Sequence, residues 1–154
     1  MACACQNRAD SPIQQLHQQV TEDHNSLMTL QQRYQQSLKD DFMWCDSMLQ
    51  YVPEEDVDKF FDILNIAQAY LSQFNQMLPV MQHDAEYSQQ QLLNLQSDID
   101  KHIINDSLAT AYLADEQAVA DTLHQRIIYF QDRLKQQDKV LQNLKKTIGK
   151  ESSR

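Results

Sequence analysis

The sequence predicts an all-α protein, a bundle of three long helices. The 154 residues contain a single glycine, Gly149, and three prolines, so the chain lacks the turn residues that β-hairpins and phosphate-binding loops need. Apolar residues instead recur at steps of three and four over long stretches, which is the spacing of one face of an α-helix. A chain of this length suits one domain with its own core.

The first predicted helix begins after Ser11, where Pro12 occupies the first helical position and Gln14 the third. This arrangement is typical of a capping box. One wider gap, around Asp23 and His24, interrupts the apolar spacing that follows. We expect the helix to end near Tyr51. Its apolar positions are Ile13, Leu16, Val20, Leu27, Leu30, Tyr34, Leu38, Phe42, Cys45, Leu49 and Val52.

The second predicted helix opens with an acidic first turn after Pro53, where the helix dipole favours negative charge. If Val57 is heptad position a, every a position to Ile99 is apolar, and the d positions run from Phe60 to His102. This register crosses Pro79 without a skip and places it at an outward b position. We therefore predict one helix of about 48 residues, kinked at Pro79. Because an interior proline costs about 3 kcal/mol, the alternative is a four-helix bundle broken at Pro79.

The third predicted helix follows the N-cap candidates Asn105, Asp106 and Ser107. It is expected to stop at Gly149, with lysines in its last turn. The prediction is a single bundle domain over residues 11–149, with a disordered N-terminus at 1–10 and a disordered tail at 150–154. The apolar positions of the third helix are Leu108, Tyr112, Val119, Leu123, Ile127, Phe130, Leu134, Leu141, Leu144 and Ile148.

The short connections near residues 52–56 and 104–107 force consecutive helices to run antiparallel. An up-down-up bundle with coiled-coil-like packing follows. At a rise of 1.5 Å per residue each helix would be roughly 60–70 Å long, so the expected molecule is a rod.

Charge and composition exclude several classes of function. The formal net charge of −9 argues against nucleic acid as a partner, and no apolar run is long enough for insertion into a membrane. The N-terminal segment lacks the apolar region of a secretory signal. The three cysteines, Cys3, Cys5 and Cys45, form no paired framework. We expect a cytoplasmic protein.

Catalysis is not expected, and neither is a cofactor. Nucleophilic catalysis needs an oxyanion hole, which tight turns or helix N-termini usually supply, and a rod almost without glycine offers few of them. Cys45 follows the apolar spacing, so we expect a buried thiol rather than a nucleophile. The sequence therefore predicts a protein that is not an enzyme.

The main functional hypothesis is a non-enzymatic helical interaction protein: a scaffold subunit, an adaptor or a secretion-type chaperone. The aromatic residues exceed what a slim core buries, and the end of the chain is basic. We expect a helical or acidic protein partner and a homodimer. The alternative for the basic residues is pairing with acids at the same end of the bundle, Asp41 among them. The predicted contact residues are Tyr70, Tyr112, Tyr129, Arg133, Lys139, Lys145 and Lys146.

The alternative hypothesis is a metal-binding or metal-sensing bundle. Counting residues from the two turns places His24 level with about residue 82 and His124 level with about residue 86. His24, His83 and His124 then share one layer with Glu86, and imidazoles with a carboxylate suit zinc. Against this, His83 falls at an outward f position. A second arrangement places His102 level with Cys3 and Cys5.

Overall fold

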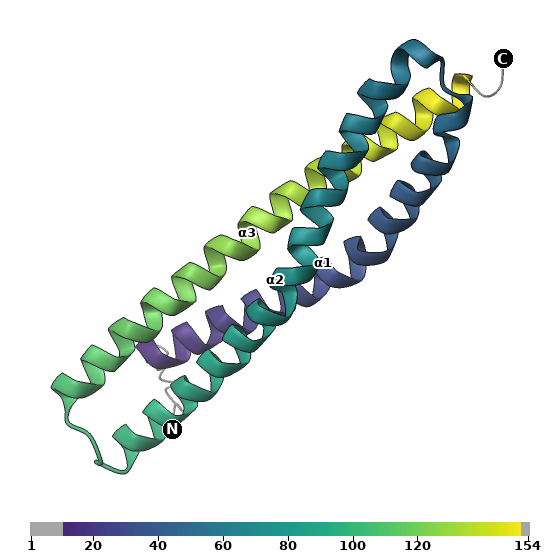
Figure 1. Cartoon of the computed structure of the whole chain (residues 1–154). Helices are drawn as coiled ribbons and strands as arrows, with labels where there is room; N and C mark the ends of the chain where they lie inside the picture. Colours follow the sequence, from purple (N-terminus) through teal and green to yellow (C-terminus); the bar gives the residue numbers. More distant parts are fainter. Residues whose placement is uncertain (1–10, 152–154) are drawn as a thin grey trace, which may run out of the picture.

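Three long helices packed side by side make up the computed structural model, which describes residues 11–151. Figure 1 shows an elongated rod in which each helix contacts both others. No strand occurs in the described part, so the predicted all-α three-helix bundle is confirmed. The elements are α1 (Pro12–Met48), a short 3-10 helix η1 (Leu49–Tyr51), α2 (Glu54–Asp100) and α3 (Asp106–Glu151). The predicted disordered N-terminus, 1–10, lies outside the described residues. Of the predicted disordered tail, 150–154, Lys150 and Glu151 belong to α3, and residues 152–154 lie outside the described part.

The predicted capping box at the start of α1 is confirmed. The backbone N–H of Gln14 donates to the Ser11 hydroxyl at 3.2 Å, and the backbone N–H of Ser11 donates to Gln14 Oε1 at 2.8 Å. Two of the unpaired donors at the helix start are thus satisfied reciprocally, and Pro12 has no N–H to satisfy.

Helix α2 is continuous through Pro79, so the four-helix alternative is wrong. Pro79 is exposed, whereas Leu78 and Met81 beside it are buried in the core. The apolar seam therefore packs on both sides of the proline. Burial of these side chains offsets the lost backbone hydrogen bond.

The end of α2 differs from the prediction. The helix stops at Asp100, and His102 adopts a left-handed φ of 55°. The N–H of Ile103 donates to the Asp98 carbonyl at 2.9 Å and that of His102 to the Ile99 carbonyl at 3.0 Å, which is a Schellman motif. His102 is therefore an exposed capping residue and not a core d position.

The start of α3 is capped as expected, but its end lies further on. Asn105 Oδ1 accepts from the Leu108 N–H at 2.9 Å. The predicted end at Gly149 is wrong, because α3 continues through Lys150 to Glu151. Gly149 has no positive φ, so it does not act as the left-handed cap that would terminate the helix.

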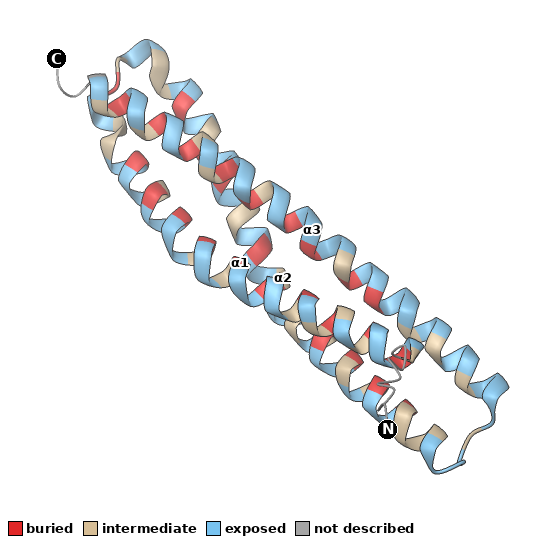
Figure 2. Ribbon diagram, turned by 180° about the vertical axis from the view of Figure 1, so that it is seen from behind, coloured by how far each residue is buried: buried red, intermediate tan, exposed pale blue. Residues whose placement is uncertain are grey.

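The buried residues face inward along all three helices (Figure 2). Phe74 on α2 is fully buried, its ring centroid 5.5 Å from that of Phe130 on α3. In the first turns of α3 the predicted core positions are wrong. The large buried residues further along α3 fix which side of the helix faces the core, and this register brings different side chains of the first turns inward. Leu108, Tyr112 and Val119 are exposed, whereas Leu113, Glu116 and Ala120 face the core.

Within residues 11–151, none of the helices is both long and apolar enough to cross a bilayer.

Replacing Pro79 with alanine is expected to raise the free energy of unfolding by about 1–3 kcal/mol, because alanine restores a backbone N–H at an exposed helical position. Urea unfolding followed by circular dichroism measures the change. The matched control is Gln68→Ala, three turns earlier on the same helix and also exposed, with an expected change within about 0.5 kcal/mol. Lower stability of Pro79→Ala would show that the core depends on the proline.

Candidate protein-interaction surface

The seam between α1 and α2 is joined by neutral amides. Gln82 Nε2 donates to Gln31 Oε1 at 3.2 Å and approaches Met28 Sδ at 3.2 Å. One layer further along, Gln89 Nε2 donates to Thr21 Oγ1 at 3.1 Å. These contacts fix the relative height of the two helices without formal charge.

The same contacts correct the expected level of His24. Gln82 lies against Met28 and Gln31, not against residue 24. The connection contains a 3-10 turn and extended residues, which rise faster per residue than an α-helix. The connection therefore shifts which residues of α1 and α2 lie at the same level along the bundle. As a result, His24 lies about one turn away from the level of His83.

The predicted histidine layer does not form a metal site. Within residues 11–151, no three His, Cys, Asp or Glu side chains are placed to hold one ion. His83 and Glu86 are exposed, and the His83 ring lies 6.3 Å from that of Tyr87. Cys3 and Cys5 lie outside the described residues.

His124 instead meets a buried carboxylate from α1. His124 Nδ1 lies 2.7 Å from Asp23 Oδ1, and Asp23 is buried. Asp23 occupies the position between Val20 and Leu27 where the apolar spacing of α1 has its wider gap. This gap is therefore a polar core position that joins α1 to α3.

A second buried carboxylate, Asp41, joins the same two helices. Asp41 Oδ1 accepts from Lys145 Nζ at 2.6 Å, and its Oδ2 accepts from the Gln142 amide. The Lys145 ammonium also lies 5.4 Å from the Trp44 ring centroid. Lys145 is thus engaged within the molecule, as the intramolecular alternative expected.

Lys139 and Lys146 differ from Lys145, although both belong to the predicted basic set. Both are exposed, and neither forms an ion pair in the described part of the chain. Of the three lysines, these two are available to a partner.

Three of the predicted contact residues come together at the seam between α2 and α3. The Arg133 guanidinium carbon lies 5.6 Å from the Tyr70 ring centroid and 5.5 Å from that of Tyr129. Nearby, Arg126 Nη1 lies 3.3 Å from Asp84 Oδ2. Tyr129 keeps 41% of its surface exposed. The cluster therefore fastens two helices and still presents an aromatic surface.

Tyr112 lies apart from this cluster. It is exposed and lines a shallow groove of about 230 Å³ between α2 and α3, together with Asp115 and Glu116. Glu116 occupies a core-facing heptad position. Its burial raises the pKa of the carboxyl, the Ser88 hydroxyl opposes the rise, and the charge of Asp115 adds to it.

Cys45 does not have the properties of a nucleophile. It is a free, fully buried thiol. Burial raises its pKa to about 11, the carboxylate of Asp41 adds to the rise, and Lys145 opposes it. Near neutral pH the side chain is therefore a thiol, which is far less reactive than a thiolate.

The outward side of α2 carries a second helical stripe, which we call the α2 outer face. Its members follow one another at steps of three and four, the same spacing as the core seam. Ile66, Val80 and Tyr87 are 53%, 45% and 57% exposed. All its members are exposed: Ile66, Ala69, Gln73, Gln76, Val80, His83, Tyr87, Gln90 and Asn94.

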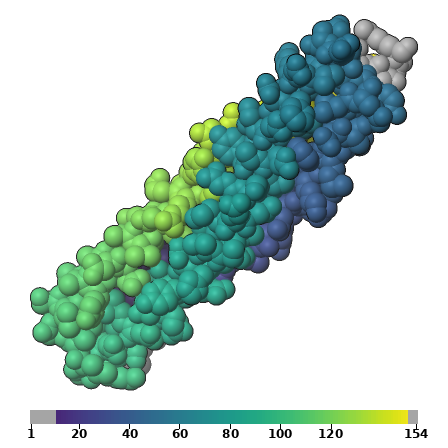
Figure 3. Space-filling view, in the orientation of Figure 1, coloured from purple at the N-terminus to yellow at the C-terminus, as the bar shows by residue number. Residues whose placement is uncertain are grey.

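Formal charge is nearly missing from this part of the chain. Between Ile63 and Ser97 the only aspartate, glutamate, lysine or arginine residues are Asp84 and Glu86, and neither belongs to the α2 outer face. Figure 3 shows α2 along the front of the molecule with α3 beside it. Charged residues are depleted at the centres of protein interfaces and abundant on ordinary surfaces.

The α2 outer face has a pattern in the sequence, which the assignment of core positions a and d alone does not reveal. Isoleucine, valine and tyrosine recur here at a single heptad position, seven or fourteen residues apart. The repeat of an apolar residue at one outward heptad position, flanked by amides instead of charges, makes this face a candidate for a second contact surface.

Comparison of the chain with family models, with curated proteins and with solved structures finds no match.

Replacing Lys145 with methionine is expected to lower the free energy of unfolding by about 1–3 kcal/mol, because buried Asp41 loses its cationic partner. Methionine keeps an apolar stem of similar length over Trp44. The controls Lys139→Met and Lys146→Met remove the same charge from exposed positions and should change stability by less than about 0.5 kcal/mol. Equal effects in all three variants would contradict a specific role for Lys145. Denaturant unfolding measures each value.

Replacing Glu116 with glutamine is expected to raise the melting temperature near neutral pH. Because the folded-state pKa is raised, the stability contributed by the protonated form is present below the unfolded pKa of about 4.3 and lost as pH rises through the folded pKa. Glutamine cannot ionise, so the gain over the wild type should grow from about pH 4 to about pH 7. Thermal unfolding across this range measures the difference, with exposed Glu86→Gln as control. A gain that does not change with pH would contradict this origin.

Proposed function

We propose that the protein is a non-enzymatic helical interaction protein that acts as a scaffold subunit, adaptor or small chaperone. The observation that carries the proposal is the α2 outer face, which combines exposed Ile66, Val80 and Tyr87 with a nearly complete lack of charge. A helix that faces only water normally carries charged residues there. A surface of this composition supports contact with another helix.

The geometry of the face suits a helix as the binding element. From Ile66 to Asn94 the stripe is roughly 42 Å long. Steps of three and four place its side chains as knobs for the holes of a facing helix. At a helix width of roughly 10 Å, the contact covers about 400 Å² on each partner. This area is at the low end for specific complexes, so we expect reversible binding.

A second copy of this chain is the partner we propose for the face. Most faces of a chain with net charge −9 repel an identical chain, whereas the α2 outer face does not. Its amides, such as Gln73 and Gln76, both donate and accept hydrogen bonds, so the face complements itself. Two α2 helices packed antiparallel around the level of Gln76 would place Ile66 of one chain opposite Tyr87 of the other.

Further binding would use the remaining exposed residues. Exposed Lys139 and Lys146, together with half-buried Arg133 of the tyrosine cluster, offer cations to an acidic protein partner. The proposal places the protein in a reducing compartment such as the cytoplasm, where the free thiol of Cys45 is stable. No observation on residues 11–151 favours the metal-binding alternative.

Replacing Val80 with glutamate is expected to shift the wild-type dimer to monomer, because each copy would bring a charge into the contact beside its centre, opposite the neutral Gln73 of the other chain. Light scattering coupled to size-exclusion chromatography, over a concentration series, measures the mass. The control is Ile128→Glu, which introduces the same charge at an exposed apolar position on α3. It should leave the dimer intact.

Circular dichroism separates loss of association from loss of fold, since Val80 is exposed and its substitution should preserve the helices. A wild-type chain that remains monomeric at every concentration would overturn the homodimer. An unchanged dimer in Val80→Glu would overturn the assignment of the contact to the α2 outer face.

A further inference from the structure

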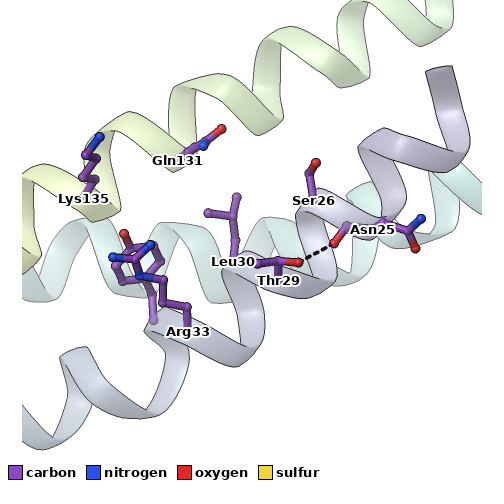
Figure 4. Close-up of a pocket in the computed structure, with 8 residues that line it drawn as sticks. Asn25, Ser26, Thr29, Leu30, Arg33, Gln131 and Lys135 are labelled. Carbon is purple, nitrogen blue, oxygen red and sulfur yellow. Dashed lines mark hydrogen bonds between the residues drawn. The ribbon is translucent and has the colours of Figure 1, made fainter.

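A small cleft lined mostly by polar side chains lies between α1 and α3. None of its residues belongs to the α2 outer face. Its volume is about 300 Å³, within the range of sites for small ligands. Figure 4 shows residues of both helices lining it, with Arg33 and Lys135 toward one end and Asn25 and Ser26 toward the other. The lining residues are Asn25, Ser26, Thr29, Leu30, Arg33, Tyr34, Gln131 and Lys135.

The charge of the cleft is opposite to that of the chain. Two cations, Arg33 and Lys135, line it, and no carboxylate does. The whole chain has 22 acidic and 13 basic residues, yet neither cation forms an ion pair in the part that the structure describes. The two cations are therefore free to meet an anion from solution.

The wall provided by α1 holds Arg33 in place. The Arg33 guanidinium carbon lies 5.0 Å from the Tyr34 ring centroid, and Tyr34 is buried. The ring is therefore a fixed platform on which the guanidinium stacks. A stacked guanidinium keeps its N–H groups at the edge, where they can bind two oxygens of one anion.

Neutral donors complete the cleft. The Thr29 hydroxyl donates to the Asn25 backbone carbonyl at 2.9 Å, so its proton is already used. The Ser26 hydroxyl and the Gln131 amide line the same space from opposite walls, and both can donate to an oxyanion.

We propose that this cleft binds the phosphate group of a small molecule. A carboxylate has two oxygens, which the Arg33 fork alone would satisfy. A phosphate has further oxygens and up to two negative charges, which match a second cation at Lys135 and the neutral donors. The net charge of −9 opposes binding only weakly, because salt screens charges more than about 8 Å away.

Titration of the full chain with inorganic phosphate and with phenyl phosphate, at constant ionic strength, tests this inference. Two-dimensional amide NMR should show shifts confined to residues 25–34 and 131–135. Arg33→Gln and Lys135→Gln should each weaken phosphate binding about tenfold, and Arg33→Lys should restore it only in part because lysine lacks the fork. Lys146→Gln removes the same charge from the exposed end of α3 and should leave binding unchanged.

Three results would overturn the site: no localised shifts with either probe, shifts spread over every cation, or equal weakening in Lys146→Gln and Arg33→Gln. All three side chains to be changed, Arg33, Lys135 and Lys146, are exposed, and circular dichroism verifies the fold of each variant. The outcome is independent of the oligomeric state and so of the α2 outer face.

Discussion

The structure depends on the uninterrupted apolar seam of α2 across Pro79. Leu78 and Met81 remain buried on either side of the exposed proline, and α2 contacts both α1 and α3. If the helix broke there, neither neighbour would have a partner long enough to cover its own apolar stripe. Continuity at one residue thus sets the helix count and the rod shape of the bundle.

Buried polar pairs specify how the helices align, which apolar packing alone does less well. Asp23 contacts His124 and Asp41 contacts Gln142, and the interval between the two contacts is the same on α1 and on α3. A shift of α3 by one turn would break both contacts and leave two buried carboxylates without partners. The leucines of the same seam would tolerate such a shift, because one leucine can replace another.

The elements that were predicted correctly have signals within a few residues of sequence. The errors concern features that depend on contacts far along the chain or on a backbone conformation that is unusual for the residue type. Ser11 with Gln14 marks a helix start within four residues, and the heptads of α2 repeat often enough to outweigh one proline. His102 caps α2 with a left-handed φ, a conformation more typical of glycine, so its role was hidden. Asp23 and Lys145 find partners about a hundred residues away. The charge distribution between the helix ends predicted a pairing such as that of Lys145 with Asp41, whereas the burial of Asp23 has no local signal beyond the gap in the apolar spacing. Leu108 and Tyr112 are exposed because the buried residues further along α3 decide which side of the helix faces the core.

Helix α2 carries two stripes of equal spacing that serve different purposes. The inner stripe, with Phe74 and Leu92, is buried and holds the fold together. The outer stripe, with Val80 and Tyr87, is exposed, so its substitution changes what α2 contacts without opening the core. Because the chain as a whole is acidic, the proposed contact between two copies uses the side of α2 that carries almost no formal charge. In the proposed dimer, fold and association would therefore be separable on a single helix, as a small adaptor or scaffold subunit requires.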